Sequence, residues 1–357
     1  MYRVIVLNNY PFEEVWGEVE RREKPDHHLY GINYFYQRGY EVEIVPFKSS
    51  PFLQFINQYK RKIPIPVGDI DQQWSTLRFL NHADIIYAPC QTQTYLLNYL
   101  RALGLIKIPI VSLAHHPLAR GRLSWLRSPL IKLWVRGNDA FPSLSQGVAN
   151  EINGILPLRS SATNWGPDAN FYPAFPRLGK GVVAAGRTGR DFITFGLGAS
   201  QTNTPSHIIC LENSVSSTFK TFGKNVQITV QPDNNYMKYS ELLEIYLNAR
   251  VLAIPMVSGL NLCGLTGLMD AIGMGKPIIM TRNTLIDIDI EEEGIGKWVA
   301  PGDIEGWKNA INFFDNNEEQ ALEMGDKARK LVDNGLNSES FANKIMDVFD
   351  KVINKNQ

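Results

Sequence analysis

The sequence predicts an α/β protein built from two doubly wound units, each with a parallel sheet. Three observations lead to this prediction. Short apolar runs that have the character of buried strands alternate with helical stretches, which is typical of parallel sheets. The alternation starts twice, once at Tyr2 and again at Gly181. The length of 357 residues also suits two domains of ordinary size.

The first series is expected to contain five strands and four helices. Its expected strands are 2–7, 41–46, 85–88, 108–113 and 140–143, and its helices are 29–37, 72–81, 92–103 and 146–153. The second series has expected strands at 181–185, 206–211, 226–230, 251–255 and 278–281, with helices at 239–248 and 265–273. The last 50 residues read as helices, the first of them entered through 301–307.

The segment Pro173-Ala-Phe-Pro176 has the composition of a linker between the two series. We therefore expect an N-terminal Rossmann-like domain at 1–172 and a C-terminal Rossmann-like domain at 173–338. Residues 339–357 are expected to form a helix that packs back on the N-terminal domain. No Gly-x-Gly-x-x-Gly fingerprint follows the first strand, which argues against a dinucleotide cofactor.

Composition indicates a soluble globular protein, with 44% apolar and 20% charged residues. The three cysteines are far apart and lack metal-ligand spacing, which indicates a reducing compartment. The chain starts with a short strand rather than a signal peptide, and no apolar run reaches membrane-spanning length. The expected location is the cytoplasm.

Charge is unevenly distributed although the net charge is zero. Residues 51–140 hold 11 Lys/Arg against 4 Asp/Glu, a balance of +7. Residues 181–357 hold 16 basic against 22 acidic residues, a balance of −6. A basic block of this kind is either solvated surface or a surface for an anionic partner. The neutral chain shows no recognised nucleic-acid-binding module.

The most informative segment starts at the turn Gly264-Leu265-Thr266, which leads into a short apolar helix with one acid, Asp270. This helix ends at Gly275-Lys276-Pro277, before the strand 278–281. A turn that enters a helix presents unpaired backbone N–H groups and a positive dipole end, which suit a phosphate. The acid further along the helix suits the two hydroxyls of a ribose. The alternative is an ordinary βαβ helix with a glycine cap.

The segment 258–277 resembles the donor-binding segment of retaining glycosyltransferases of the GT-B fold, especially family four. That family carries roughly Glu-Gly-Phe-Gly-Leu-x-x-x-Glu-Ala-x-Ala-x-Gly-Lys-Pro. Further similarities follow in the family's order along residues 1–345. They are Arg38-Gly39-Tyr40-Glu41-Val42, the interdomain stretch 164–173, Ala185-Gly186-Arg187-Thr188-Gly189-Arg190 and Val299-Ala300-Pro301-Gly302-Asp303. The resemblance implies two Rossmann-like domains that face each other across a cleft.

The resemblance also implies site residues. Arg187 and Arg190 follow an apolar strand, where the family uses basic residues in place of a metal to neutralise the leaving nucleotide. His115 falls on the family's histidine beside the donor sugar, with His116 as the alternative. The family's first glutamate falls on Leu262, or on Asn261 if one residue is inserted, so the Glu-x7-Glu motif is degenerate here.

The donor-binding set implied in this way comprises backbone groups of the glycine turn, the acid of the helix, and the positions just described. Its members are Asn261, Gly264, Leu265, Thr266, Asp270 and His116. No metal and no cofactor besides the nucleotide-sugar substrate is expected.

The function implied by the resemblance is retaining transfer of a sugar from a nucleotide-diphosphate donor to a glycan or lipid-linked acceptor. The N-terminal domain would bind the acceptor and the C-terminal domain the donor, in bacterial surface polysaccharide or glycolipid synthesis. The missing glutamate leaves open a catalytically silent nucleotide-sugar-binding partner subunit. A sugar-nucleotide epimerase of the same fold is a third reading.

Two further patterns have both a functional and a structural interpretation. The Asp-x-Asp strings at 69–71 and 287–289 bind Mn²⁺ or Mg²⁺ in other glycosyltransferases, but they also suit helix starts and solvated charge runs. Residues 120–136 carry five basic groups with Trp125 and Trp134. They are expected either to lie on an anionic membrane surface or to pack on the sheet with cations in solvent.

Overall fold

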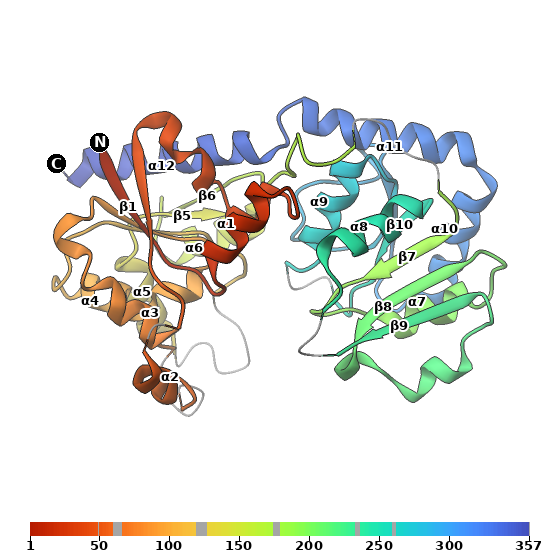
Figure 1. Ribbon diagram of the computed structural model, residues 1–357, viewed down its shortest axis with the longest axis horizontal. Coiled ribbons are helices and arrows are strands. Elements are labelled where there is room, and N and C mark those ends of the chain that lie inside the picture. Colours follow the sequence, from red (N-terminus) through yellow and green to blue (C-terminus); the bar gives the residue numbers. More distant parts are fainter. Residues whose placement is uncertain are drawn as a thin grey trace. The chain divides into compact units, whose positions relative to one another are not determined.

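The computed structural model describes residues 1–48, 50–59, 66–118, 127–173, 179–232, 236–258 and 262–356. The chain divides into two compact units. Unit 1 comprises residues 1–21, 26–165 and 338–357, and unit 2 comprises 22–25 and 166–337. Residues 174–176 of the expected linker lie outside the described residues. Each unit is an α/β structure with a parallel sheet, as the sequence predicts (Figure 1).

Unit 1 contains a four-stranded parallel sheet in the order β2-β1-β3-β4 and a separate parallel pair, β5-β6. The strands are β1 (Tyr2–Val6), β2 (Tyr40–Ile44), β3 (Ile85–Ala88), β4 (Ile110–Ser112), β5 (Phe141–Ser143) and β6 (Ser160–Ala162). The helices are α1 (Phe12–Glu20), α2 (Pro51–Asn57), α3 (Ile70–Thr76), α4 (Tyr95–Ala102), α5 (Ser128–Arg136), α6 (Gln146–Ile155) and α12 (Ser338–Asn356).

The C-terminal helix α12 packs within unit 1, on the side of the sheet that carries Tyr87. The ring of Phe349 lies 5.1 Å from that of Phe35 and 5.3 Å from that of Tyr87. Arg38 donates to Asp347 at 2.5 Å and fixes the outer surface of the helix. The other face of the sheet buries aliphatic side chains, among them Ile5, Ile86, Leu97 and Ile110.

Unit 2 contains a six-stranded parallel sheet in the order β12-β11-β10-β7-β8-β9. The strands are β7 (Val182–Ala185), β8 (Ser206–Leu211), β9 (Val226–Gln231), β10 (Val251–Ile254), β11 (Ile278–Thr281) and β12 (Gly296–Val299). The helices are α7 (Phe192–Ala199), α8 (Tyr239–Asn248), α9 (Leu265–Met274), α10 (Ile304–Asn316) and α11 (Glu318–Asp333).

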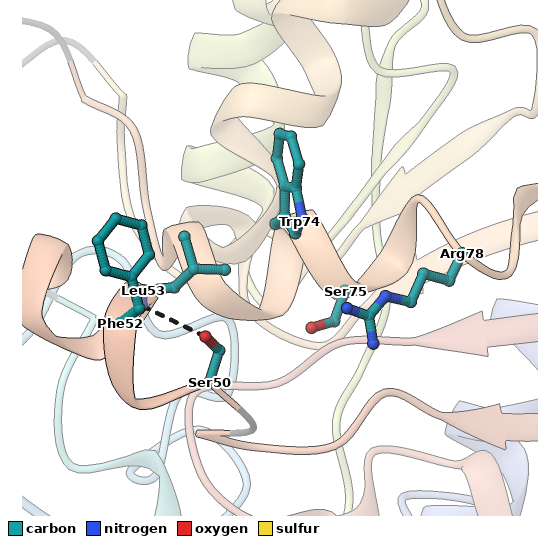
Figure 2. A pocket seen from close by; sticks show the side chains of 6 residues that line it. All are labelled: Ser50, Phe52, Leu53, Trp74, Ser75 and Arg78. Carbon is teal, nitrogen blue, oxygen red and sulfur yellow. Dashed lines mark hydrogen bonds between the residues drawn. The ribbon is translucent and has the colours of Figure 1, made fainter.

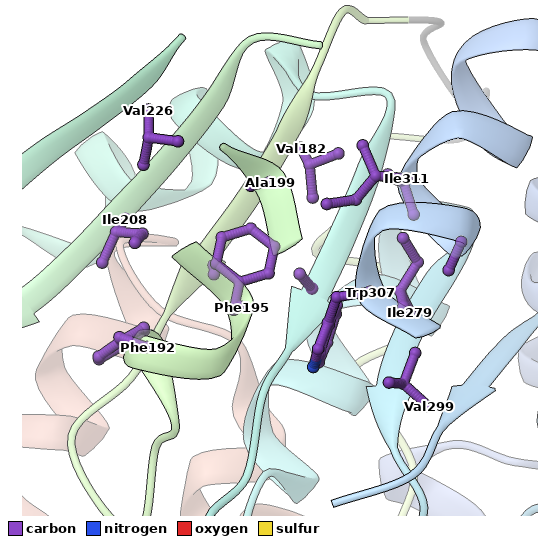
Figure 3. Close-up of a cluster of buried hydrophobic side chains, with 14 of the residues drawn as sticks. Val182, Phe192, Phe195, Ala199, Ile208, Val226, Ile279, Val299, Trp307 and Ile311 are labelled. Carbon is purple, nitrogen blue, oxygen red and sulfur yellow. The ribbon is translucent and has the colours of Figure 1, made fainter. Parts of the chain in front are cut away.

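The core of unit 2 lies between one face of this sheet and helices α7 and α10 (Figure 3). Val182, Phe195 and Trp307 belong to this buried cluster, and the rings of Phe195 and Trp307 meet edge to face at 5.2 Å. Successive strand residues point to opposite faces, so alternate apolar residues of β7 and β10 pack under α7 and α10. Helix α9 contacts β10 and packs against α11.

The structure confirms the expected strands at 85–88, 206–211 and 278–281 and the helix at 239–248. The helix expected at 29–37 is wrong, because the segment instead forms two 3-10 helices, Asp26–Leu29 and Ile32–Arg38. Tyr30 and Gly31 between them have φ of 50° and 87°. A Cβ on Gly31 would lie 2.9 Å from the Cβ of Ala342 in α12, so the packed C-terminal helix favours glycine at this break.

Helix α5 has a buried apolar side, which corrects the membrane interpretation for the part of 120–136 that the structure describes. Trp134 is 2% exposed, and its ring lies 4.6 Å from that of Tyr95 and 5.4 Å from that of Phe141. A side chain packed in the core cannot reach a lipid surface. The expected contacts Arg120, Arg122 and Trp125 lie outside the described residues. In the part of the chain that is described, no helix combines the length and the apolar character needed to cross a membrane.

Candidate functional site

The switch point of the six-stranded sheet is the natural place for a ligand in unit 2. Strands β7 and β10 are neighbours, yet the chain leaves β7 toward β8 on one side and β10 toward β11 on the other. Loops that diverge in this way open a crevice at the carboxyl ends of the strands. The turn after β7 carries Arg187 and Arg190, and the segment after β10 leads to Gly264 and α9.

Arg190 is used to build the turn that follows β7. Its Nε donates to the carbonyl of Ala185 at 3.2 Å, and its Nη1 donates to the carbonyl of Thr188 at 3.0 Å. Nη1 also lies 3.0 Å from the sulfur of Met256, and burial lowers the pKa of the guanidinium. Gly186, at φ 143°, leaves the space that this guanidinium fills, since a Cβ there would lie 2.2 Å from Nε. The structure therefore places Arg190 as a group that fixes the turn.

Arg187 has a different environment, although it belongs to the same turn. Its side chain is exposed, and its Cζ lies 3.7 Å from the ring centroid of Tyr236. Tyr236 follows β9 and is 41% exposed. A guanidinium that stacks on an aromatic ring keeps its N–H donors available at its edge. Arg187 is thus the arginine of the turn that is available for an anionic ligand.

The turn after β7 lies against the segment that leads to α9. Val257 N donates to Gly189 O at 3.0 Å, and Asp191 N donates to Pro255 O at 3.2 Å. A Cβ on Gly189 would lie 3.9 Å from the sulfur of Cys263, the residue before the helix cap. The basic turn and the start of α9 are therefore neighbours in space.

Helix α9 begins at Leu265, and the residue that caps it is Gly264, whose φ of 87° lies in the left-handed region. A Cβ here would lie 2.9 Å from Ile254 Cγ2, so both the backbone conformation and the packing on β10 favour glycine. Glycine has no side chain to cap the N–H groups of the first turn, which includes Leu265 and the exposed Thr266. A helix start of this kind attracts an anion through its N–H groups and its dipole.

Asp270 lies in the middle of α9 and is 2% exposed. Its carboxylate accepts a hydrogen bond from Tyr172 at 2.7 Å and another from Tyr239. Burial raises the pKa of Asp270 to about 6, and the two tyrosine hydroxyls oppose this shift. The structure thus places two tyrosines against Asp270, the side chain predicted to bind the ribose. A ribose would have to share the carboxylate with these hydroxyls or displace them.

The sequence reasoning missed both tyrosines as site residues. Tyr172 lies within the stretch 164–173 that resembles the family's interdomain motif, and Tyr239 is the first residue of the predicted helix 239–248. Both tyrosines lie in segments that the sequence already singles out, and this position could have indicated that they belong to the site. The Gly-Lys-Pro end of the motif has a structural role, because Lys276 is 1% exposed and donates to the carbonyls of Leu247 and Ala249, each at 2.7 Å.

The predicted histidines lie at the carboxyl end of β4 in unit 1. His115 Nε2 lies 2.5 Å from the carbonyl of Pro89, and the geometry assigns the proton to Nε2 as donor. Burial lowers the pKa of His115 to about 4, so the imidazole is neutral near pH 7. The ring of Tyr30 meets it edge-on at 5.5 Å. A neutral ring in this tautomer offers Nδ1 as an acceptor for a hydroxyl.

Gln91 holds the segment that carries both histidines and was not predicted from the sequence. Its Oε1 accepts the backbone N–H groups of His115 and, at 3.4 Å, of His116. Its Nε2 donates to the carbonyl of His116 at 2.6 Å. Gln91 follows the expected strand 85–88, and that position at a strand end is the signal that could have found it.

The remaining predicted positions have no ligand role that the structure describes. Asn261 lies outside the described residues, and Leu262 is 5% exposed. The Asp-x-Asp strings are used locally: Asp69 caps α3 by accepting from Gln72 N at 3.0 Å, and Asp289 accepts from Trp298 Nε1 at 2.8 Å. Within the described ranges no group of three His, Cys, Asp or Glu side chains is placed to hold a metal ion.

Comparison with known proteins gives matches of structure. No protein-family profile matches the chain, and no curated protein matches it by sequence. The structure of HepE from Anabaena in complex with UDP-glucose matches with a TM-score of 0.66 at 13% identity, over 98% of this chain and 100% of that one. Sucrose-phosphate synthase from Thermosynechococcus elongatus matches with a TM-score of 0.67 at 12% identity, over 99% and 100%.

A glycosyltransferase from Rickettsia africae matches with a TM-score of 0.62 at 12% identity, over 99% of this chain and 98% of that one. The chain has the GT-B fold. This result confirms the fold that the resemblance implies: two Rossmann-like units, of which unit 2 carries the basic turn and the start of α9 at its switch point.

Proposed function

We propose that this protein is a retaining glycosyltransferase that transfers a sugar from a nucleotide-diphosphate donor without a metal ion. One observation carries the proposal: at the switch point of unit 2, an exposed arginine turn lies beside a glycine-started helix. Arg187 and the N–H groups of Gly264–Thr266 supply positive charge. This charge would stabilise the negative charge that grows on the diphosphate as its bond to the sugar breaks. The similarity of fold to HepE, whose structure was determined with UDP-glucose, supports a UDP-sugar as donor.

In this proposal the residues of unit 1 act on the sugar rather than on the nucleotide. His115 Nδ1 accepts a hydrogen bond from a sugar hydroxyl, because Nε2 carries the proton and donates it to the carbonyl of Pro89. Gln91 fixes the backbone on which the histidine sits. Attack on the same face as the leaving group uses the departing phosphate to accept the acceptor's proton, so no protein nucleophile is needed. A glycan or lipid-linked acceptor of a bacterial surface polysaccharide or glycolipid fits the basic block at 51–140.

The direct experiment is turnover with a panel of nucleotide sugars in excess chelator, with glycan and polyprenyl-linked acceptors. Release of nucleotide that depends on the acceptor, with retained anomeric configuration in the product, is the expected result. Arg187→Ala should lose this activity, whereas an exposed cation changed elsewhere in unit 2 should not affect it. Activity that appears only when Mg²⁺ or Mn²⁺ is added would contradict the metal-independent mechanism.

A catalytically silent nucleotide-sugar-binding subunit is the second candidate, and Leu262 favours it. By strict spacing Leu262 occupies the position of the family's first glutamate, and it is buried and apolar. A silent subunit would bind nucleotide sugar with the affinity of an enzyme but turn over none of the donors. An epimerase would need acids around the sugar, and it would convert the nucleotide sugar without any acceptor.

A further inference from the structure

Helix α2 of unit 1 has its polar side turned toward the protein. Ser50, Gln54 and Asn57 follow helical spacing and meet α3. Gln54 Nε2 donates to Asp71 at 2.7 Å, and Ser50 N donates to the same carboxylate at 3.2 Å. Asn57 Nδ2 donates to Asp69 at 3.1 Å, while its Oδ1 accepts from the N–H of Ile70 at 2.9 Å. Hydrogen bonds to two carboxylates tie the polar side of this helix to the protein.

The apolar side of α2 consequently faces outward. Phe52, Phe55 and Tyr59 are spaced three and four residues apart and are 71%, 55% and 45% exposed. All seven residues of the helix are described, and none of them is buried. Trp74 of α3 adds an indole that is 54% exposed. Surface helices of water-soluble proteins normally show the opposite arrangement, with the apolar side on the core.

A pocket of about 400 Å³ opens between the two helices (Figure 2). Phe52 and Leu53 from α2 and Trp74 from α3 give it apolar walls, and Arg78 lies at its border. Single exposed apolar residues are common on protein surfaces, but a contiguous apolar patch with a polar rim is typical of an interaction site. We name Phe52, Phe55, Tyr59, Trp74 and Arg78 the aromatic face of unit 1.

Charge indicates what covers this face. Of the charged residues that the structure describes between 48 and 78, two are basic and two are acidic. The two acids, Asp69 and Asp71, are the ones that bind the polar side of α2. Lys48 and Arg78 are exposed at the ends of this segment. The exposed basic side chains therefore attract an anionic surface, whereas they would repel the same basic side chains on a second copy of this face.

The residue types match the boundary of a lipid bilayer. Tryptophan and tyrosine concentrate at membrane–water interfaces, where the ring is apolar and the N–H or O–H is wet. A basic side chain near an anionic leaflet is attracted to the lipid phosphates. We propose that the aromatic face docks on an anionic bilayer, with Phe52, Phe55 and Trp74 at the acyl boundary and Arg78 against lipid phosphate. This proposal does not depend on the proposed transferase activity.

The test is co-sedimentation of the full chain with vesicles of phosphatidylcholine alone or mixed with phosphatidylglycerol. We expect binding to the mixed vesicles only, with release as salt rises, because screening weakens attraction between exposed charges. The double variant Phe52→Ser with Phe55→Ser should lower the partition coefficient by about a hundredfold or more, because it removes two phenyl rings from the acyl boundary. Its thermal unfolding should be unchanged, because both rings are already exposed.

The matched control is Leu103→Ser with Leu105→Ser, two side chains of unit 1 that are 65% and 70% exposed. This control should bind vesicles as the unchanged chain does. Brominated lipid should quench fluorescence of the unchanged chain, and Trp74→Phe should remove that quenching. UDP affinity should be equal in all of these variants, which separates this proposal from the proposed function.

Three results would overturn the proposal. The first is equal binding to neutral and anionic vesicles. The second is equal loss of binding in the control pair. The third is concentration-dependent dimerisation, without vesicle binding, that Phe52→Ser with Phe55→Ser abolishes, because a second copy would then cover the face. Charge reversal at Arg127 and Lys132 on α5 should have a smaller effect than the phenylalanine pair, and a larger effect would assign the contact to α5.

Discussion

Replacing Arg187 by Ala should weaken the binding of UDP more than the binding of uridine. The guanidinium is exposed at the carboxyl end of β7 and stacks on Tyr236 at 3.7 Å, so its expected partner is the diphosphate. A charge-assisted hydrogen bond is worth roughly 1.5–3 kcal/mol. Because this side chain is open to solvent, we take the lower end of that range, which corresponds to about a tenfold higher Kd for UDP.

Isothermal titration calorimetry in excess chelator measures this difference. Uridine has no phosphate, so its Kd should change by less than about twofold, well under 1 kcal/mol. Lys224→Ala is the matched control, because it removes an exposed cation at the amino end of the same sheet, just before β9. Its affinity for both ligands should equal that of the unchanged chain.

An unaltered UDP affinity in a well-folded Arg187→Ala variant would refute the assignment of the basic turn to the diphosphate. If uridine affinity falls by the same factor as UDP affinity, Arg187 acts through Tyr236 or through the shape of the loop instead. The variant is expected to fold, because the turn itself is held by Arg190 and by the backbone bond from Val257 N to Gly189 O at 3.0 Å.

Four other predictions concern Asp270, His115 and the metal. Asp270→Asn should discriminate ribose from deoxyribose nucleotides less well than the unchanged chain, because an amide replaces only part of the acceptor capacity of a carboxylate. If competition binding shows the same ribose preference in both proteins, Asp270 does not belong to the site. The pKa of Asp270 is raised to about 6, so the folded state binds the proton more tightly than the unfolded state, and stability should fall as pH rises from about 4 to 6. Denaturant unfolding should show that this fall, on the order of 2–3 kcal/mol, is absent in Asp270→Asn, and parallel pH profiles would contradict the burial argument. His115→Ala should reduce transfer more than UDP binding, and the pH profile of transfer should show no limb from its titration above pH 6, since the pKa is about 4; the same loss in His116→Ala alone would shift the assignment by one residue. UDP affinity should be the same in chelator and in Mg²⁺, and an affinity that needs the metal would point to a different set of phosphate ligands.

Most strands of the two larger sheets were predictable because the strands of parallel α/β sheets are short apolar runs with turn residues at their ends. The runs 85–88, 206–211 and 278–281 have this form, and the structure places strands there. The glycine-started helix with Asp270 was predictable for a similar local reason, since Gly264 and Gly275 mark its two ends. Strand β12 escaped prediction because Lys297 and Trp298 interrupt its apolar pattern.

The environments of the site residues depended on partners far away in the sequence. Asp270 and Tyr172 are 98 residues apart, and no local pattern links them. Arg187 and Arg190 belong to one turn, but only Arg190 folds over Gly186 and bonds with the loop carbonyls. Periodicity gives the apolar side of a helix but not what that side packs against. The apolar side of α5 packs in the core, where Trp134 is buried. The apolar side of α2, with Phe52 and Phe55, faces outward instead, because Asp69 and Asp71 bind the polar side of that helix.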